Sequence, residues 1–156
     1  MTKYEKSCAV FGHRQIIVTN ELINTLKDTF IDLIINKGVC IFYFGGFGEF
    51  DELCWKIITE LKQCTFPNIK RVYVCEKEDY VNRPHKRPKN LNTDNYDEIV
   101  FFVLDFDYWY TAVYYRNIAI IDHSDFNIFY IRDTENSGAY KAYTYAKRKK
   151  RTIIMV

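Results

Sequence analysis

The sequence has little of what disulfide frameworks, metal sites and membrane segments require. Its 156 residues include 3 prolines, 6 glycines and 5 cysteines, with no C-x-x-C pair. Most of the cysteines lie in apolar segments, so we expect reduced core residues and neither a disulfide framework nor a zinc site. No apolar run approaches the roughly 18 residues that span a bilayer. The first residues lead straight into a strand and predict no signal peptide. We therefore expect a cytoplasmic protein with no metal, no cofactor and no membrane partner.

An excess of charge of one sign is also lacking. The chain has 22 Lys and Arg against 20 Asp and Glu, a net charge of +2 at pH 7. This charge is too small to argue for a nucleic-acid partner by itself. The basic run at residues 147–151 falls in the last turn of an expected helix, where cations suit the helix dipole. We therefore expect no nucleic-acid partner.

The sequence does contain alternating strand-like and helix-like segments. Helical spacing predicts helices over residues 20–37, from the glycines near 48 to about 63, over 108–122 and over 139–151. Apolar runs predict core strands at residues 8–11, 39–44, 69–75, 126–131 and 152–156. We expect an α/β, Rossmann-like three-layer fold, with a mainly parallel sheet in the core order 3-2-1-4-5. No internal repeat interrupts the pattern, and residues 1–156 are expected to form one domain.

Two segments between these elements leave alternatives open. Residues 76–97 form a long polar stretch, which is either a lid over a pocket or a surface excursion. Residues 97–104 are either an extra short strand or part of a loop.

Glycines interrupt the chain directly after the second strand. Gly45, Gly46 and Gly48 lie between this strand and a helix. A helix that begins there points unpaired N–H groups and a partial positive charge at the turn, which suits a phosphate. The alternative is that the glycines only shape the turn from strand to helix.

Two further polar turns follow the first and fourth core strands. Gly12, His13 and Arg14 form the first turn, and Ser137 and Gly138 lie in the second. In the expected strand order these turns face each other where the winding reverses, the usual ligand position in such sheets. Arginine side chains and helix N-termini there would suit an anionic, nucleotide-like ligand. The plainer interpretation of the first turn is a solvated loop.

The candidate ligand-binding residues extend beyond these turns. Arg116 lies in the middle of a helix, and it either reaches the site or pairs with Asp122 or another carboxylate. The complete set is Gly12, His13, Arg14, Gly45, Gly46, Phe47, Gly48, Glu49, Arg116, Ser137 and Gly138.

Several motifs taken together resemble the SLOG superfamily. They are Phe-Gly-His-Arg at 11–14, Gly-Gly-Phe-Gly-Glu-Phe-Asp at 45–51, Arg-Asn at 116–117, Asp-His-Ser-Asp-Phe at 122–126, and Ser-Gly-Ala at 137–139 before a Tyr-Ala-Lys-Arg helix. The resemblance covers nearly the whole chain and is to small single-domain bacterial and phage proteins. It implies a Rossmann-like fold that recognises nucleotides or nucleotide-derived ligands, as a sensor, sequestering or regulatory module.

The resemblance also implies an alternative function. LOG-like enzymes of this superfamily cleave the N-glycosidic bond of nucleoside 5'-monophosphates and carry the motif Pro-Gly-Gly-x-Gly-Thr-x-x-Glu. Here Phe44 replaces the Pro and Glu49 replaces the Thr, whereas the glycines and Glu52 match. The Arg-Lys motif of that branch is missing. In a hydrolase, Glu52 or Asp51 would act as general base or stabilise a cationic ribosyl transition state. Asp51 otherwise only complements the helix dipole.

A group of aromatic residues suggests a third function, that of a protein-interaction module. Tyr and Trp are favoured in interfaces, so residues 108–110 with Tyr114 and Tyr115 could form a homodimer face. The alternative is that these side chains line the core or a pocket.

Overall fold

Six parallel strands form the central sheet of this structure, a computed structural model that describes residues 5–45, 48–103, 112–132 and 137–156. The strands are β1 (Lys6–Phe11), β2 (Val39–Phe44), β3 (Lys70–Val74), β4 (Glu98–Val100), β5 (Phe126–Phe129) and β6 (Ile153–Met155). Their order is β4-β3-β2-β1-β5-β6, and every neighbouring pair is parallel. The predicted core order is confirmed, with β5 and β6 as the fourth and fifth core strands. The extra strand predicted as one alternative for residues 97–104 is β4, at the edge beside β3.

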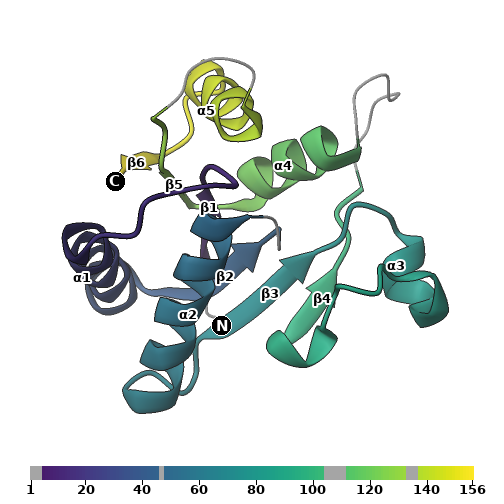
Figure 1. The fold of residues 1–156 in the computed structure, drawn as a ribbon, viewed down its shortest axis with the longest axis horizontal. Coiled ribbons are helices and arrows are strands. Elements are labelled where there is room, and N and C mark those ends of the chain that lie inside the picture. Colours follow the sequence, from purple (N-terminus) through teal and green to yellow (C-terminus); the bar gives the residue numbers. More distant parts are fainter. Residues whose placement is uncertain (1–4, 46–47, 104–111, 133–136) are drawn as a thin grey trace.

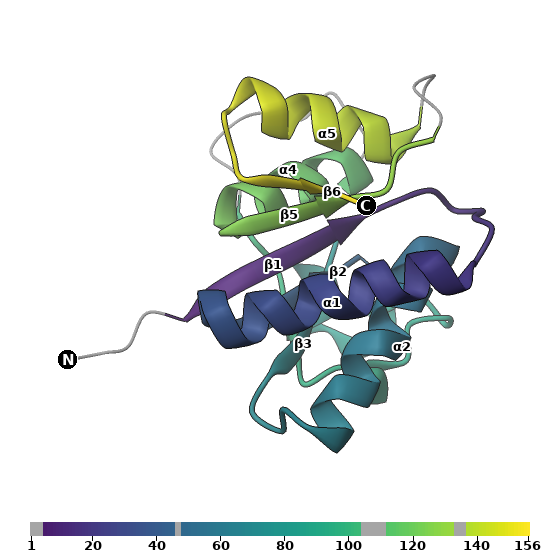
Figure 2. The same cartoon turned by 90° about the vertical axis from the view of Figure 1, so that its left-hand side faces the viewer.

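Helices cover both faces of the sheet (Figures 1 and 2). They are α1 (Asn20–Lys37), α2 (Glu49–Cys64), α3 (Asp79–Asn82), α4 (Ala112–His123) and α5 (Gly138–Arg148). One core lies between the sheet and the pair α1 and α2, and a second core involves α4 and α5. None of the described helices combines the length and the apolar character needed to cross a bilayer.

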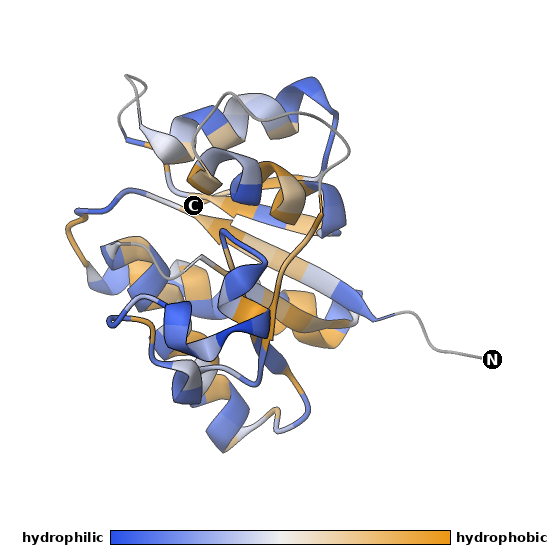
Figure 3. Cartoon of the chain, turned by 90° about the vertical axis from the view of Figure 1, so that its right-hand side faces the viewer, coloured by the Kyte–Doolittle hydropathy of each residue, from blue (hydrophilic) through white to orange (hydrophobic). Residues whose placement is uncertain are grey.

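The middle strand shows why the sheet is buried on both faces. In β1, Cys8 and Val10 contribute to the core under α1 and α2, whereas Ala9 and Phe11 contribute to the core under α4 and α5. Successive side chains of a strand point to opposite faces, so an unbroken apolar run serves both cores. Figure 3 shows this hydrophobic interior between more hydrophilic outer helix surfaces.

Local signals set the ends of α1 as the sequence predicts. The N-cap Thr19 accepts a hydrogen bond from the Leu22 N–H at 3.1 Å. Gly38 follows the last residue with φ of 74°, a left-handed conformation that favours glycine.

Other segments differ from the sequence prediction. Residues 76–97 contain α3 and the 3-10 helices η1 (Pro84–Lys86) and η2 (Thr93–Asn95), where only a polar loop was expected. The described part of α4 begins at Ala112, so the predicted start at 108 lies outside the described residues. The 5 cysteines all lie within the described residues and form no disulfide, but Cys64 is exposed and is not a core residue.

Candidate functional site

The carboxyl ends of β1 and β2 and the beginning of α5 border a cleft of about 390 Å³. Its lining residues are Val10, Phe11, Gly12, His13, Arg14, Gly45, Asp51, Val113, Arg116, Asn117, Ile120, Ser137, Gly138 and Ala139. Small-molecule pockets commonly have volumes of this size. The three polar turns of the sequence analysis therefore lie at one cleft. Gly46 and Phe47 lie outside the described residues.

Cationic groups and a helix N-terminus dominate the polar lining of the cleft. Among the described lining residues, Arg14 and Arg116 are the arginines, and Asp51 is the one residue with a carboxylate. Helix α5 begins at Gly138, and no acidic residue lies in its first turn. Its N-cap Ser137 accepts a hydrogen bond from the Tyr140 N–H at 3.0 Å. Since the first N–H groups of a helix lack intrahelical partners, this end of the cleft favours an anion.

The beginning of α2 differs from the expectation of unpaired N–H groups. The Glu49 N–H donates to the Arg14 carbonyl at 2.9 Å, and the Phe50 N–H donates to the His13 carbonyl at 3.4 Å. The first turn of α2 also carries Glu49, Asp51 and Glu52. We therefore attribute the attraction for an anion to α5 and the arginines, and not to the start of α2.

Arg116 reaches the cleft and also pairs with a carboxylate. Only 3% of its side chain is exposed, and Nη1 donates to the Gly45 carbonyl at 3.0 Å and to Glu76 Oε1 at 3.1 Å. Nη2 donates to Asn117 Oδ1 at 3.4 Å, and within the described part of the chain Nε has no hydrogen-bond partner. A Cβ on Gly45 would lie 2.6 Å from Nη2, so glycine permits this close approach.

The sequence leaves the partner of Arg116 open between Asp122 and another carboxylate, and Glu76 is not among the predicted site residues. Asp122 instead accepts a hydrogen bond from the Tyr145 hydroxyl at 3.0 Å. The available signal for Glu76 was its position, since it lies close after the carboxyl end of β3.

His13 and Gly12 have structural roles at the edge of the cleft. His13 Nε2 accepts a hydrogen bond from the Arg132 N–H at 2.7 Å, which joins the turns after β1 and β5. A Cβ on Gly12 would overlap the ring of Phe50, so only glycine lets α2 pack this closely.

The two candidate general bases occupy different positions. Asp51 is buried, lines the cleft and accepts a hydrogen bond from the Gly45 N–H at 3.3 Å. The side chain of Glu52 is 62% exposed and pairs with Lys56 at 3.1 Å. Glu52 therefore lies outside the cleft.

A second hollow of about 640 Å³ adjoins the cleft. Its lining residues are Arg14, Gly48, Glu49, Asp51, Glu52, Trp55, Lys56, Tyr73, Glu76, Pro88, Asn90, Leu91, Asn92, Asn95 and Tyr96. Arg14 and Asp51 belong to both linings. We call it the side hollow; Gly48 and Glu49, expected in the ligand site, lie here.

The predicted aromatic dimer face is described only in part. Tyr115 is buried in the core under α4 and α5, and Tyr114 packs against this core. Residues 108–110 lie outside the described residues. Tyr115 is thus a core residue, and a homodimer stays a prediction.

The comparisons with known proteins support the fold. No protein-family model matches the chain, and no curated protein matches it. Among solved structures, the X-ray structure of TM1055, a target of the Northeast Structural Genomics Consortium, matches with a TM-score of 0.53. The two sequences are 15% identical, and the match covers 95% of this chain and 72% of that chain. This similarity shows the Rossmann-like α/β fold.

Proposed function

We propose that the chain binds a nucleotide or nucleotide-derived ligand in the cleft and acts as a sensor, sequestering or regulatory module. The observation that carries this proposal is that Arg14, Arg116 and the N-terminus of α5 line one cleft at the carboxyl edge of a parallel sheet. A phosphate would accept hydrogen bonds from the first N–H groups of α5 and from an arginine.

The resemblance to the SLOG superfamily supports the same proposal. Gly12, Arg14, Gly45, Ser137 and Gly138 belong to the motifs that carry the resemblance, and all of them line the cleft. Residues that carry the sequence resemblance thus also line the cleft. We propose on this basis that the chain is a SLOG-like protein.

Titration calorimetry with AMP, GMP, CMP and UMP tests the proposal. A Cβ on Gly138 would meet no atom within 4 Å, so Gly138→Leu should obstruct the cleft without disturbing the core. Thr144→Leu, at an exposed position of the same helix outside the cleft, is the matched control. We expect at least one nucleotide to bind, with affinity reduced by about tenfold or more in Gly138→Leu, or roughly 1.4 kcal/mol. Absence of binding by all four nucleotides, or equal binding by both variants, would refute the proposal.

One observation favours the hydrolase alternative enough to test it. Asp51 is a buried carboxylate that lines both the cleft and the side hollow. If the phosphate lies in the cleft, the sugar lies near this carboxylate, which would stabilise a cationic ribosyl transition state.

Incubation with the same nucleotides and detection of free base tests this activity. Asp51→Asn keeps an oxygen for the Gly45 N–H but removes the charge, and it should abolish base release. Glu52→Gln, at the exposed neighbouring carboxylate, should leave base release intact. A flat trace at high protein concentration would exclude the hydrolase.

A further inference from the structure

We propose that the side hollow is the second half of the ligand site and takes the uncharged planar ring of a ligand whose anionic group occupies the cleft. This inference rests on the function proposed for the cleft and adds the position and orientation of the ligand.

Adjacency of the two cavities is the first argument. Arg14 and Asp51 line both of them. The side hollow, at about 640 Å³, is larger than the cleft at about 390 Å³. A ligand with its phosphate against α5 therefore has space for a further ring system on the far side of these two residues.

The charged residues of the two cavities determine how the ligand is oriented. Among the described residues, the charged ones that line the side hollow are the cations Arg14 and Lys56 and the carboxylates Glu49, Asp51, Glu52 and Glu76. Carboxylates thus outnumber cations here, whereas arginines outnumber the carboxylate in the cleft. Two of these carboxylates are in ion pairs, Glu76 with Arg116 and Glu52 with Lys56, but Glu49 still makes the described lining of the side hollow more negative than that of the cleft. An anion therefore favours the cleft over the side hollow. We therefore place the uncharged part of the ligand in the side hollow.

The walls of the side hollow suit a planar ring. Trp55, Tyr73 and Tyr96 provide aromatic surface, and the ring centroids of the two tyrosines are 5.2 Å apart. Burial raises the pKa of Tyr73 to about 12, although the charge of Arg116 opposes this shift, so its hydroxyl is neutral at physiological pH. Bases stack on aromatic side chains. The amide groups of Asn90 and Asn95 add donors and acceptors for ring edges.

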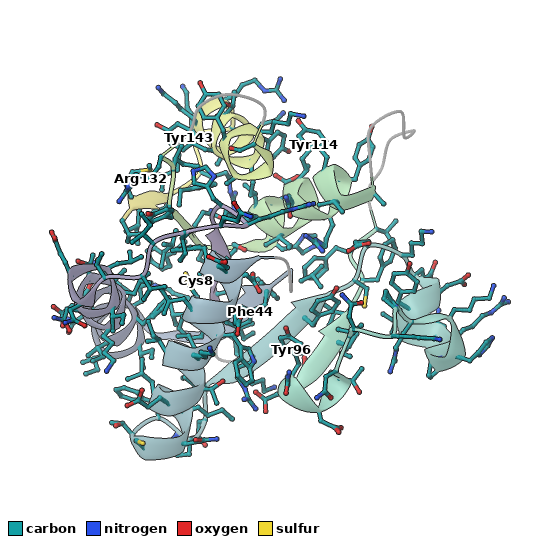
Figure 4. All side chains as sticks on the ribbon, viewed as in Figure 1. Cys8, Phe44, Tyr96, Tyr114, Arg132 and Tyr143 are labelled. Carbon is teal, nitrogen blue, oxygen red and sulfur yellow. The ribbon has the colours of Figure 1, made fainter. Side chains whose placement is uncertain are left out.

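These walls are joined before any ligand binds. Trp55 Nε1 donates to the Asn95 carbonyl at 2.9 Å, which ties α2 to the segment of residues 88–96. The ring of Tyr96 lies against Phe44, with centroids 6.3 Å apart, and both residues are labelled in Figure 4. A preformed site loses less conformational entropy on binding. The walls of the side hollow are therefore held together without a ligand.

Intrinsic fluorescence tests whether a ring enters the side hollow. The chain has 2 tryptophans, Trp55 and Trp109, so emission from a Trp109→Phe protein reports on Trp55 alone. We expect AMP to change this emission and ribose 5-phosphate, which lacks the ring, to leave it unaltered. Calorimetry should show AMP binding about tenfold or more tighter than ribose 5-phosphate, as expected for one base stacked on aromatic side chains.

Two variants test whether the preference for AMP arises in the side hollow. Asn90→Phe places a bulky side chain at an exposed position of the lining and should remove the preference for AMP over ribose 5-phosphate. Asn82→Phe, exposed on α3 and outside the lining, should keep that preference.

The outcomes separate the two proposals. If AMP binds with unaltered Trp55 emission and both variants keep the same preference, the inference is overturned while the function proposed for the cleft stands. If neither AMP nor ribose 5-phosphate binds, and the other nucleotides also fail, the proposed function is refuted and the inference falls with it.

Discussion

Arg116 joins two segments of the chain at the cleft. Its buried guanidinium group contacts the ends of β2 and β3 at the same time, through Gly45 and Glu76. Taking a charged pair out of water is costly, and good geometry must offset that cost. Removing one member therefore has a larger effect than removing both.

Arg116→Met should lower the free energy of unfolding by about 3 kcal/mol, because it leaves the Glu76 carboxylate and the Gly45 carbonyl without this donor. The double variant Arg116→Met/Glu76→Gln should lose less than the sum of the single variants. Urea denaturation measures all of these values. Strict additivity would contradict a coupled ion pair.

Asp97 gives the fold a dependence on pH. Its carboxylate accepts hydrogen bonds from the Arg71 N–H at 2.8 Å and from Arg71 Nε at 3.2 Å. Burial raises its pKa, but the hydrogen bonds from Arg71 and the charges of Arg71 and Lys62 outweigh burial, so the pKa lies below its ordinary value of 3.8. A carboxyl group with a lowered pKa stabilises the fold above its unfolded-state pKa, and this stabilisation is lost as pH falls through the folded-state value.

Asp97→Asn should therefore lower the free energy of unfolding by about 1 kcal/mol at neutral pH. The difference in the free energy of unfolding between Asp97→Asn and the wild type should disappear as the pH falls below about 4. Denaturation at a series of pH values measures it, with Asp28→Asn, exposed on α1, as the matched control. A gap that stays constant down to the lowest pH would show that the charge of Asp97 is not involved.

At the scale of elements, the two helices that begin near the cleft have different N-termini. The first turn of α2 carries three acidic residues, and two of its N–H groups donate to the carbonyls of residues 13 and 14. The first turn of α5 carries no acidic residue. The two helix starts are therefore not equivalent as anion sites.

Ser137→Asp separates helix stability from anion binding. Aspartate is as good an N-cap as serine, so the thermal midpoint should stay near that of the wild type. Its negative charge at the cleft should reduce the affinity for AMP by about tenfold or more. Thr19→Asp makes the same kind of change at the N-cap of α1 and is the control. If both variants bind AMP like the wild type, no anion lies at α5.

A feature of these helices was predictable where the residues that determine it are close in the sequence. Thr19 and Gly38 are neighbours of the helix that they end, so α1 was predicted correctly. Gly12 is required because of Phe50, and the first amides of α2 are used by the turn after β1. Both contacts join segments far apart in the sequence, so no local pattern indicates them.

At the scale of the whole molecule, the sheet has a well-protected centre and short edges. Strand β1 pairs with β2 and β5, whereas β4 and β6 have 3 residues each and lie at the two edges. Hydrogen exchange followed by mass spectrometry should therefore find the slowest amides in β1 and β2 and the fastest strand amides in β4 and β6. Uniform protection across the sheet would contradict this.

The strand order was predictable because alternating strands and helices with right-handed connections allow few arrangements. That order also predicted which turns meet at the cleft. The sequence leaves residues 76–97 open between a lid over a pocket and a surface excursion, and it does not indicate the side hollow itself, because residues 88–96 form one of its walls and have no periodic pattern. The Asn residues at positions 90, 92 and 95, close after Pro88, were a further hint.

The turn after β1 limits which mutations can change the ligand preference of the cleft. Its backbone is fixed through the His13 and Arg14 carbonyls, and a Cβ on Gly48 would lie 2.6 Å from Arg14 Cα. Insertions or deletions in this turn would therefore break the backbone hydrogen bonds that hold the start of α2. Exchange of the Arg14 side chain alone leaves those backbone bonds in place. A library that randomises this position and keeps the glycines constant should yield folded proteins with new preferences.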